Sequence, residues 1–123
     1  MAKVLGVGGV FLRCKDVEAY RAWWAKFMGL DITDWGTFEW EREPRSRSML
    51  SPFSNDSDYF SPSSERAMIN LQVEDVSTLV AQAKNGGATI VGEIEQTEYG
   101  TFGWFIDPEG FKIELWEAPS AAP

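Results

Sequence analysis

Apolar and polar residues alternate from Val4 to Cys14, which is the period-two pattern of a β-strand with one buried face. Asp16 then offers an N-cap, and apolar residues recur at helical spacing from Val17 up to Gly29, where a glycine favours a helix end. The chain is therefore predicted to open with a strand, followed by a helix that carries an apolar stripe.

The next segment is predicted to be mainly extended. Residues 31–43 carry a strand pattern that a turn or bulge breaks at Trp35-Gly36, and residues 46–53 predict a further, more weakly marked strand. Residues 54–65 (SNDSDYFSPSSE) are polar and rich in turn formers, so they read as a connection. We expect a boundary between two halves of the chain at this connection.

The second half repeats the first at an offset of 59 residues, so that Val10 corresponds to Ile69 and Asp16 to Asp75. Residues 66–73 alternate like the first strand, and Asp75 caps a second helix that a glycine pair ends. The remaining predicted strands cover residues 88–97, 101–106 and 111–117.

Two such units, each a strand, a helix and three more strands, cannot bury the faces of their sheets alone. Paired, they make a curved, cup-shaped sheet of eight strands with the helices outside, which is an α+β fold. We expect one domain over residues 1–123, built from a first module at about 4–54, a linker at 55–65, a second module at about 66–117 and a tail at 118–123.

The stretch DPEGFKIELWE, residues 107–117, is the most informative part of the chain. Asp107, Pro108 and Gly110 each suit one position of a tight turn, so a hairpin is expected to reverse there. On the strand that follows, Glu114 lies in the middle of the face opposite the apolar one. A carboxylate is costly in that position unless it meets water, a ligand or a partner.

This hairpin, which EYGTFGWFI precedes, resembles the last hairpin of the vicinal oxygen chelate superfamily. That superfamily contains glyoxalase I, bleomycin-resistance proteins, fosfomycin-resistance proteins and extradiol dioxygenases. The resemblance implies the same paired-module fold that the repeat predicts, and it implies a homodimer. In metal-using members the glutamate of this strand is the last ligand of a divalent metal, and Glu114 matches it.

The other metal ligands that the resemblance implies have no counterpart in this chain. The first corresponds to Gly9 and the third to Met68, and neither residue is a good ligand for the ions that such sites hold. The second would come from residues 45–55, which contain neither a carboxylate nor a histidine, and the whole chain has no histidine. We therefore expect no metal and no other cofactor.

Two roles are open for Glu114. In a structural role it pairs with Arg13 or bonds to a hydroxyl inside the cup, since buried charges are normally paired. In a functional role it orients a ligand or acts as a general base, which makes it the candidate catalytic residue. The loop segments 58–60 and 99–100 either close the mouth of the cup or are plain connections. Strand parity and aromatic character give the candidate ligand contacts Phe11, Arg13, Asn70, Gln72, Trp104 and Trp116.

Composition narrows the class of partner. The net charge of −8 repels phosphate backbones, so we expect no nucleic acid partner and favour a cationic or neutral ligand. No apolar run approaches the roughly 18 residues that span a bilayer, and the first residues do not resemble a signal peptide, which predicts a cytoplasmic protein without membrane contact. The single Cys14 is expected in the core, and Trp23 beside the helix stripe favours a homodimer.

These observations favour a glyoxalase-like protein that binds a small organic ligand, cationic or aromatic, in a metal-free cup. Bleomycin-resistance proteins are the precedent within the superfamily. Whether the chain is an enzyme stays open, and the first alternative is a lyase or isomerase related to lactoylglutathione lyase with Glu114 as general base. The second alternative is a non-catalytic partner or regulatory module, for which we expect a flat or filled cup.

Overall fold

A computed structural model of the chain describes residues 2–28, 31–43 and 46–119. Over these residues the chain forms eight strands and two helices. Gly29, the expected helix end, and residues 120–123 of the expected tail lie outside the described residues. In chain order the elements are β1 (Val4–Cys14), α1 (Val17–Met28), β2 (Phe38–Glu43), β3 (Ser46–Ser54), β4 (Ala67–Val73), α2 (Val76–Asn85), β5 (Thr89–Ile90), β6 (Glu95–Thr97), β7 (Gly100–Ile106) and β8 (Lys112–Glu117).

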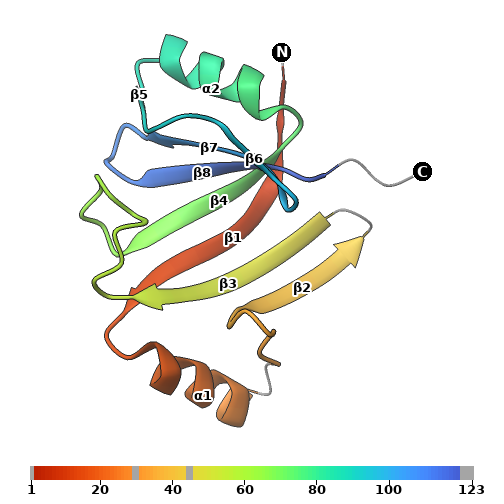
Figure 1. The fold of residues 1–123 in the computed structure, drawn as a ribbon, viewed down its shortest axis with the longest axis vertical. Coiled ribbons are helices and arrows are strands. Elements are labelled where there is room, and N and C mark those ends of the chain that lie inside the picture. The colour runs from red at the N-terminus through yellow and green to blue at the C-terminus, as the bar shows by residue number, and fades with distance from the viewer. Residues whose placement is uncertain (1, 29–30, 44–45, 120–123) are drawn as a thin grey trace.

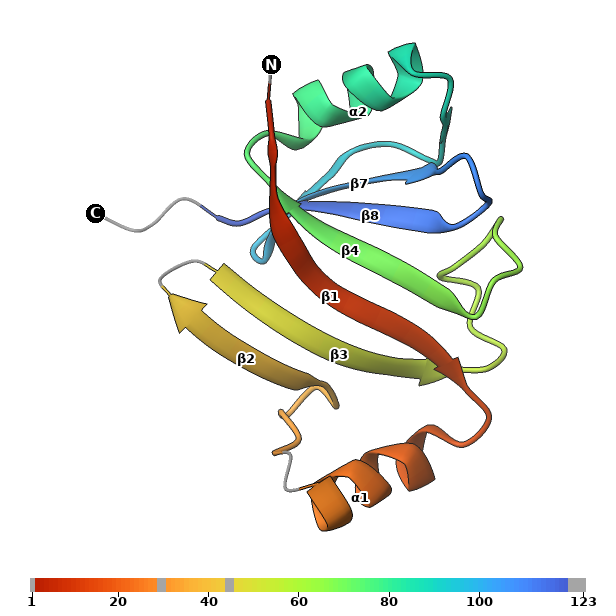
Figure 2. The ribbon, with the colours of Figure 1, turned by 180° about the vertical axis from the view of Figure 1, so that it is seen from behind.

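One mixed sheet contains all eight strands in the order β2-β3-β1-β4-β8-β7-β5, with β6 paired to β7. The sheet curves without closing into a barrel, and α1 and α2 lie near its opposite ends (Figures 1 and 2). At its centre β1 and β4 pair antiparallel, with Val10 opposite Ile69. These two residues correspond to each other in the sequence repeat, so the two modules meet at equivalent positions. The predicted α+β fold is confirmed.

The first module has one strand pattern that the structure shortens. The strand predicted over residues 31–43 begins only at Phe38. Its first part closes a turn instead, because the backbone N–H of Thr33 donates to the carbonyl of Thr37 at 2.9 Å and that of Gly36 donates to the carbonyl of Thr33 at 2.9 Å. The break that Trp35-Gly36 predicted is therefore real, and it removes the strand before it.

The second module gains a strand, because a break divides one predicted strand into two. The strand predicted over residues 88–97 splits into β5 and β6 around Gly92, whose φ of +68° is a conformation that glycine adopts readily. The first module thus contributes three strands and the second contributes five. Residues 55–66 between the modules form turns, as the polar sequence predicted.

Buried apolar residues gather on both faces of the sheet. Successive side chains of a strand alternate between faces, so β4 contributes to both groups. The cluster that faces α2 consists of Val73, Val76, Ile113 and Leu115. The cluster on the other face, which we call the inner face, consists of Phe11, Phe60 and Met68. The inner face is thus covered in part by Phe60, which belongs to the connection between the modules.

Both helices begin at the predicted N-caps. The carboxylate of Asp16 accepts from the backbone N–H of Ala19 at 3.0 Å, and that of Asp75 accepts from the N–H of Thr78 at 3.2 Å. These bonds fix where the chain leaves β1 and β4. In the part of the chain that the structure describes, neither helix combines the length and the apolar character needed to cross a membrane.

Candidate functional site

The centre of the inner face is one row of side chains that crosses the sheet. Met49 of β3 lies opposite Gly9 of β1, and Gly9 lies opposite Asn70 of β4. Asn70 lies opposite Glu114 of β8, which lies opposite Trp104 of β7. Facing residues on neighbouring strands project to the same side. The sheet register therefore gathers the polar side chains of Asn70 and Glu114 and the indole of Trp104 in one place.

Glu114 is only 2% exposed, and its carboxylate takes three hydrogen bonds from neutral side chains. Asn70 Nδ2 donates to Oε1 at 2.7 Å, and Trp104 Nε1 donates to Oε2 at 2.9 Å. The hydroxyl of Tyr59 donates to the same Oε2. A Cβ on Gly8 would lie 2.1 Å from Asn70 Oδ1, so the glycine is what allows Asn70 to approach.

Tyr59 reaches this row from the connection between the modules. Its ring stacks on Phe53, with centroids 5.6 Å apart and planes 7° apart, and meets Trp104 edge to face at 6.3 Å. Burial, and then the neighbouring negative charge of Glu114, raise the pKa of the Tyr59 hydroxyl above its ordinary value. The hydroxyl is therefore a stable hydrogen-bond donor to the carboxylate at neutral pH.

Lys112 completes the group of charged residues on the inner face. Its buried ammonium donates to the backbone carbonyl of Tyr59 at 2.5 Å. It lies 5.1 Å from the centroid of the Tyr59 ring and 5.8 Å from that of Trp104. Burial lowers the pKa of the Lys112 ammonium, while the charges of Glu114 and Asp58 oppose that shift. Lys112 holds the connection in place over Glu114.

Arg13 does not pair with Glu114, which corrects the structural partner that sequence parity suggested. Its guanidinium donates instead to the carbonyls of Glu65 at 3.1 Å and Ser63 at 3.4 Å. It also lies 4.8 Å from the centroid of the Phe60 ring. The reason is register, because Arg13 lies four residues beyond Gly9 along β1 and so meets the connection rather than the row. Arg13 therefore anchors the connection.

The structure distributes the other candidate ligand contacts over two environments. Phe11 is buried against Phe60 in the apolar cluster. Gln72 and Trp116 face each other in the next row of the inner face, where Trp116 also lies opposite Phe102. The indole Nε1 of Trp116 donates to the carbonyl of Tyr99 at 2.8 Å, and all three side chains of this row are half-buried. This row is a second aromatic surface beside Glu114.

Sequence reasoning missed two members of the site. Lys112 was assigned to the correct face by parity, but nothing in the pattern of its strand marked it as a contact of the connection. Tyr59 lies in the segment expected either to close the cup or simply to connect, and the structure assigns it the first role. The signal was an aromatic pair, Tyr59-Phe60, inside an otherwise polar stretch.

The residues of the inner face do not fit the divalent metal that the superfamily resemblance implies. A side chain on Gly9 would meet Met49 at 2.6 Å, and Met68 is buried in the apolar cluster. The carboxylate of Glu114 already accepts from three donors. Within the described residues, no three histidine, cysteine or acidic side chains are grouped so as to hold a metal. We derive no step through a metal.

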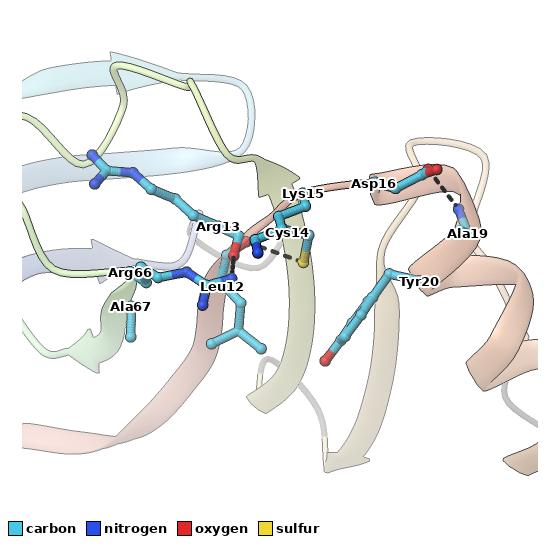
Figure 3. A pocket seen from close by; sticks show the side chains of 9 residues that line it. All are labelled: Leu12, Arg13, Cys14, Lys15, Asp16, Ala19, Tyr20, Arg66 and Ala67. Carbon is cyan, nitrogen blue, oxygen red and sulfur yellow. Dashed lines mark hydrogen bonds between the residues drawn. The ribbon is translucent and has the colours of Figure 1, made fainter.

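A separate cavity of about 600 Å³ opens between the end of β1 and α1 (Figure 3). Three of its charged side chains have structural partners, since Asp16 caps α1, Arg66 donates to the carbonyl of Arg13 at 3.0 Å and Arg13 donates to the connection. Cys14 in its wall is a buried free thiol, as predicted, and burial raises the pKa of that thiol. Glu114 is not among its lining residues, which are Leu12, Arg13, Cys14, Lys15, Asp16, Ala19, Tyr20, Arg66 and Ala67. We assign no function to this cavity.

Comparison with known proteins agrees with the architecture. The profile of one family, described as Glyoxalase-like domain, matches residues 9–116, and no curated protein matches the chain. Methylmalonyl-CoA epimerase from Mycobacterium tuberculosis is 17% identical, with a TM-score of 0.62 over 98% of this chain and 90% of its own. A variant of Streptomyces coelicolor methylmalonyl-CoA epimerase, in complex with 2-nitronate-propionyl-CoA, is 13% identical, with a TM-score of 0.73 over 96% and 100%. A glyoxalase/bleomycin resistance protein/dioxygenase superfamily member from Vibrio splendidus is 15% identical, with a TM-score of 0.58 over 95% and 99%.

Proposed function

The chain belongs to the Glyoxalase-like domain family, and from this premise we propose that it binds a small aromatic or cationic organic molecule over Glu114 without a metal. The observation that carries the proposal is a carboxylate, 2% exposed, whose three hydrogen-bond donors are all neutral. Once the Tyr59 side chain is displaced, such a group offers a ligand a hydrogen-bond acceptor. Aromatic rings of Phe53 and Trp104 beside it offer flat surfaces for stacking.

A purely structural role explains Glu114 less well. Burying a carboxylate costs several kcal/mol, and well-packed apolar residues of similar volume are often as stable or more stable. Of the two partners that a structural role predicted, Arg13 bonds to the connection instead, whereas a hydroxyl is present in Tyr59. A neutral hydroxyl leaves the buried carboxylate without a hydrogen-bonded cation. Tyr59 and Lys112, beside Glu114 in this cluster, both have shifted pKa values, and such shifts are concentrated at functional sites.

Ligand entry requires the Tyr59 side chain to move, because its hydroxyl covers the carboxylate. The two aromatic residues of the connection differ in this respect. Phe60 is 0% exposed and packs in the apolar cluster, whereas Tyr59 is 36% exposed. A ligand that displaces the Tyr59 side chain alone gains access to Glu114 and leaves the anchor at Phe60 intact.

A second candidate function is an isomerase or lyase in which Glu114 is the general base. The hydroxyl of Tyr59 bonds to the carboxylate, and the ammonium of Lys112, whose pKa burial lowers, lies over the Tyr59 and Trp104 rings beside it. Several proteins of similar fold are epimerases acting with CoA esters, which motivates testing the same reaction class. A non-catalytic regulatory module, the third candidate, is favoured by the filled cup.

The test is a ligand screen on three proteins: the wild type, Glu114→Gln, and Glu109→Gln as a control with the same change in net charge at an exposed turn position. Aromatic and cationic compounds are screened by the rise in melting temperature, and hits are titrated by calorimetry. We expect hits whose affinity falls in Glu114→Gln and not in Glu109→Gln. Binding that is equal in all three proteins would exclude Glu114 as the ligand contact. Racemisation or elimination of a hit by the wild type alone would favour the enzyme instead.

A further inference from the structure

One residue of the connection, Tyr59, contacts each of the main groups of the site. The hydroxyl of Tyr59 donates to Glu114, its ring stacks on Phe53 and meets the edge of Trp104, and its carbonyl accepts from Lys112 at 2.5 Å. The donor, the flat ring and the acceptor therefore all come from this single residue. The chain itself thus fills the site with a substituted phenol.

We propose that the Tyr59 side chain stands in for the ligand, and that the ligand is a hydroxylated aromatic compound, that is, a phenol. This inference rests on the proposed function, because it names the class of molecule that the Glu114 site takes. The ligand displaces the Tyr59 side chain and replaces its contacts one by one. The phenol donates to Glu114 and its ring takes the place of the Tyr59 ring against Phe53 and Trp104, while the backbone carbonyl of Tyr59 keeps its bond to Lys112.

The neighbouring charges select a neutral donor over a cation. A ring in the position of Tyr59 lies 5.1 Å below the ammonium of Lys112. A second positive charge on the ligand would be repelled by that buried ammonium, where the surroundings screen charge poorly. A hydroxyl donates equally well to Glu114 without this repulsion. Of the two ligand classes in the proposed function, the geometry therefore points to the aromatic one.

The aromatic residues support the same choice. Phe53 and the Tyr59 ring are nearly parallel, so the space that Tyr59 leaves is a flat slot bounded by Phe53 on one side and by Trp104 at its edge. A flat slot excludes bulky aliphatic groups more strongly than a round cavity does. Moreover, Gln72, Trp116 and Phe102 continue the surface beside it, which leaves room for substituents on the ring.

The experiment removes the phenol side chain of Tyr59 by mutation and adds a phenol as a free compound. The variant Tyr59→Ala is titrated with p-cresol, which is the tyrosine side chain as a free compound, with toluene, which lacks the hydroxyl, and with benzylamine, which is cationic. Binding is followed by calorimetry. We expect p-cresol to bind one per chain, about 10- to 150-fold more tightly than toluene, which is the range for one hydrogen bond to a charged group.

Benzylamine is expected to bind more weakly than p-cresol. In the double variant Tyr59→Ala, Glu114→Gln the preference for p-cresol over toluene should shrink towards none. If toluene or benzylamine equals p-cresol in Tyr59→Ala, the phenol assignment fails while the proposed aromatic site stands. If the folded variant binds none of the three compounds, the proposed function fails with it.

The variant also tests the idea if it is too unstable to purify in folded form. A ligand that binds only the folded state shifts the unfolding equilibrium by mass action. We then expect p-cresol, and not toluene, to restore cooperative unfolding and near-UV circular dichroism to Tyr59→Ala. Failure of p-cresol to do so would overturn the proposal.

Discussion

Replacing Glu114 by glutamine separates the charge of the side chain from its shape. Trp104 Nε1 is only a donor, so the glutamine oxygen must take the place of Oε2. The glutamine amide NH₂ then faces Asn70, which can turn its own amide over and present Oδ1 as the acceptor. The three side chains that bond to Glu114 therefore keep a bond to residue 114 in Glu114→Gln, and we expect the fold to survive.

The stability change follows from two opposing effects. A hydrogen bond to a charged group contributes about 1.5–3 kcal/mol and a neutral one about 1 kcal/mol, so the three bonds together lose roughly 1.5–6 kcal/mol. The same substitution removes the cost of burying a carboxylate, which is also several kcal/mol. We expect the free energy of unfolding to change by less than about 2 kcal/mol, which is a shift in melting temperature of less than roughly 8 °C for a domain of this size.

Glu114→Ala provides the contrast. It leaves the side-chain donors of Asn70 and Trp104 buried without an acceptor, at about 1–3 kcal/mol each, and it opens a cavity as well. Denaturant unfolding of both variants beside the wild type measures the difference, and ligand titration of Glu114→Gln should give about a 10- to 150-fold loss of affinity. If Glu114→Gln is as unstable as Glu114→Ala, or if its affinity is unchanged, the charge serves the fold and the functional assignment of Glu114 is refuted.

Three further outcomes can be measured on the wild type and one variant. We expect no stoichiometric divalent metal bound through Glu114, and elemental analysis giving about one zinc, nickel or manganese per chain would contradict this. We expect a homodimer in sedimentation equilibrium, because Trp23 is 47% exposed and other large apolar side chains also meet solvent, whereas a clean monomer of 13.8 kDa at micromolar concentration would exclude it. The raised pKa of Tyr59 predicts that the folded wild type and Tyr59→Phe gain equal tyrosinate absorbance up to about pH 11. Above about pH 10 the unfolded chain loses the Tyr59 proton that the folded chain keeps, so the stability of the wild type should fall with pH more steeply than that of Tyr59→Phe, and parallel curves would contradict the shift.

The fold was predictable because its strongest signals are local and repeated. Alternation marked β1 and β4, aspartate caps marked both helices, and the repeat matched Val10 with Ile69, which the structure pairs at the centre of the sheet. The strand boundaries that were predicted wrongly have local causes, which the strand propensities of the residues do not reveal. Thr33 and Thr37 close a turn through their side chains and backbone, and that turn ends what the pattern alone extends.

The site was only partly predictable, because the alternation along a strand shows which face a side chain occupies. It does not show which residue of the neighbouring strand lies opposite. Glu114, Asn70 and Trp104 were on the list of candidates, and the ladder brings them together. Arg13 shares their face, but a displacement of four residues along an extended strand is about 13 Å, which is too far for a hydrogen bond to Glu114. The donor that takes its place, Tyr59, comes from a turn whose path no periodicity describes.

The three donors to Glu114 differ in how they are held, and this difference determines how the site can work. Asn70 and Trp104 belong to strands that pair with β8, so their backbone positions beside Glu114 are held by the ladder. Tyr59 belongs to a connection, and it can leave without moving a strand. A ligand thus meets a carboxylate with two fixed donors and one exchangeable position. Its apparent affinity is the intrinsic affinity reduced by the fraction of molecules in which Tyr59 has moved away. A compound that only reproduces the contacts of Tyr59 must therefore bind weakly to the wild type, and tight binding requires additional contacts, for which Gln72, Trp116 and Phe102 are the nearest side chains in the adjoining row.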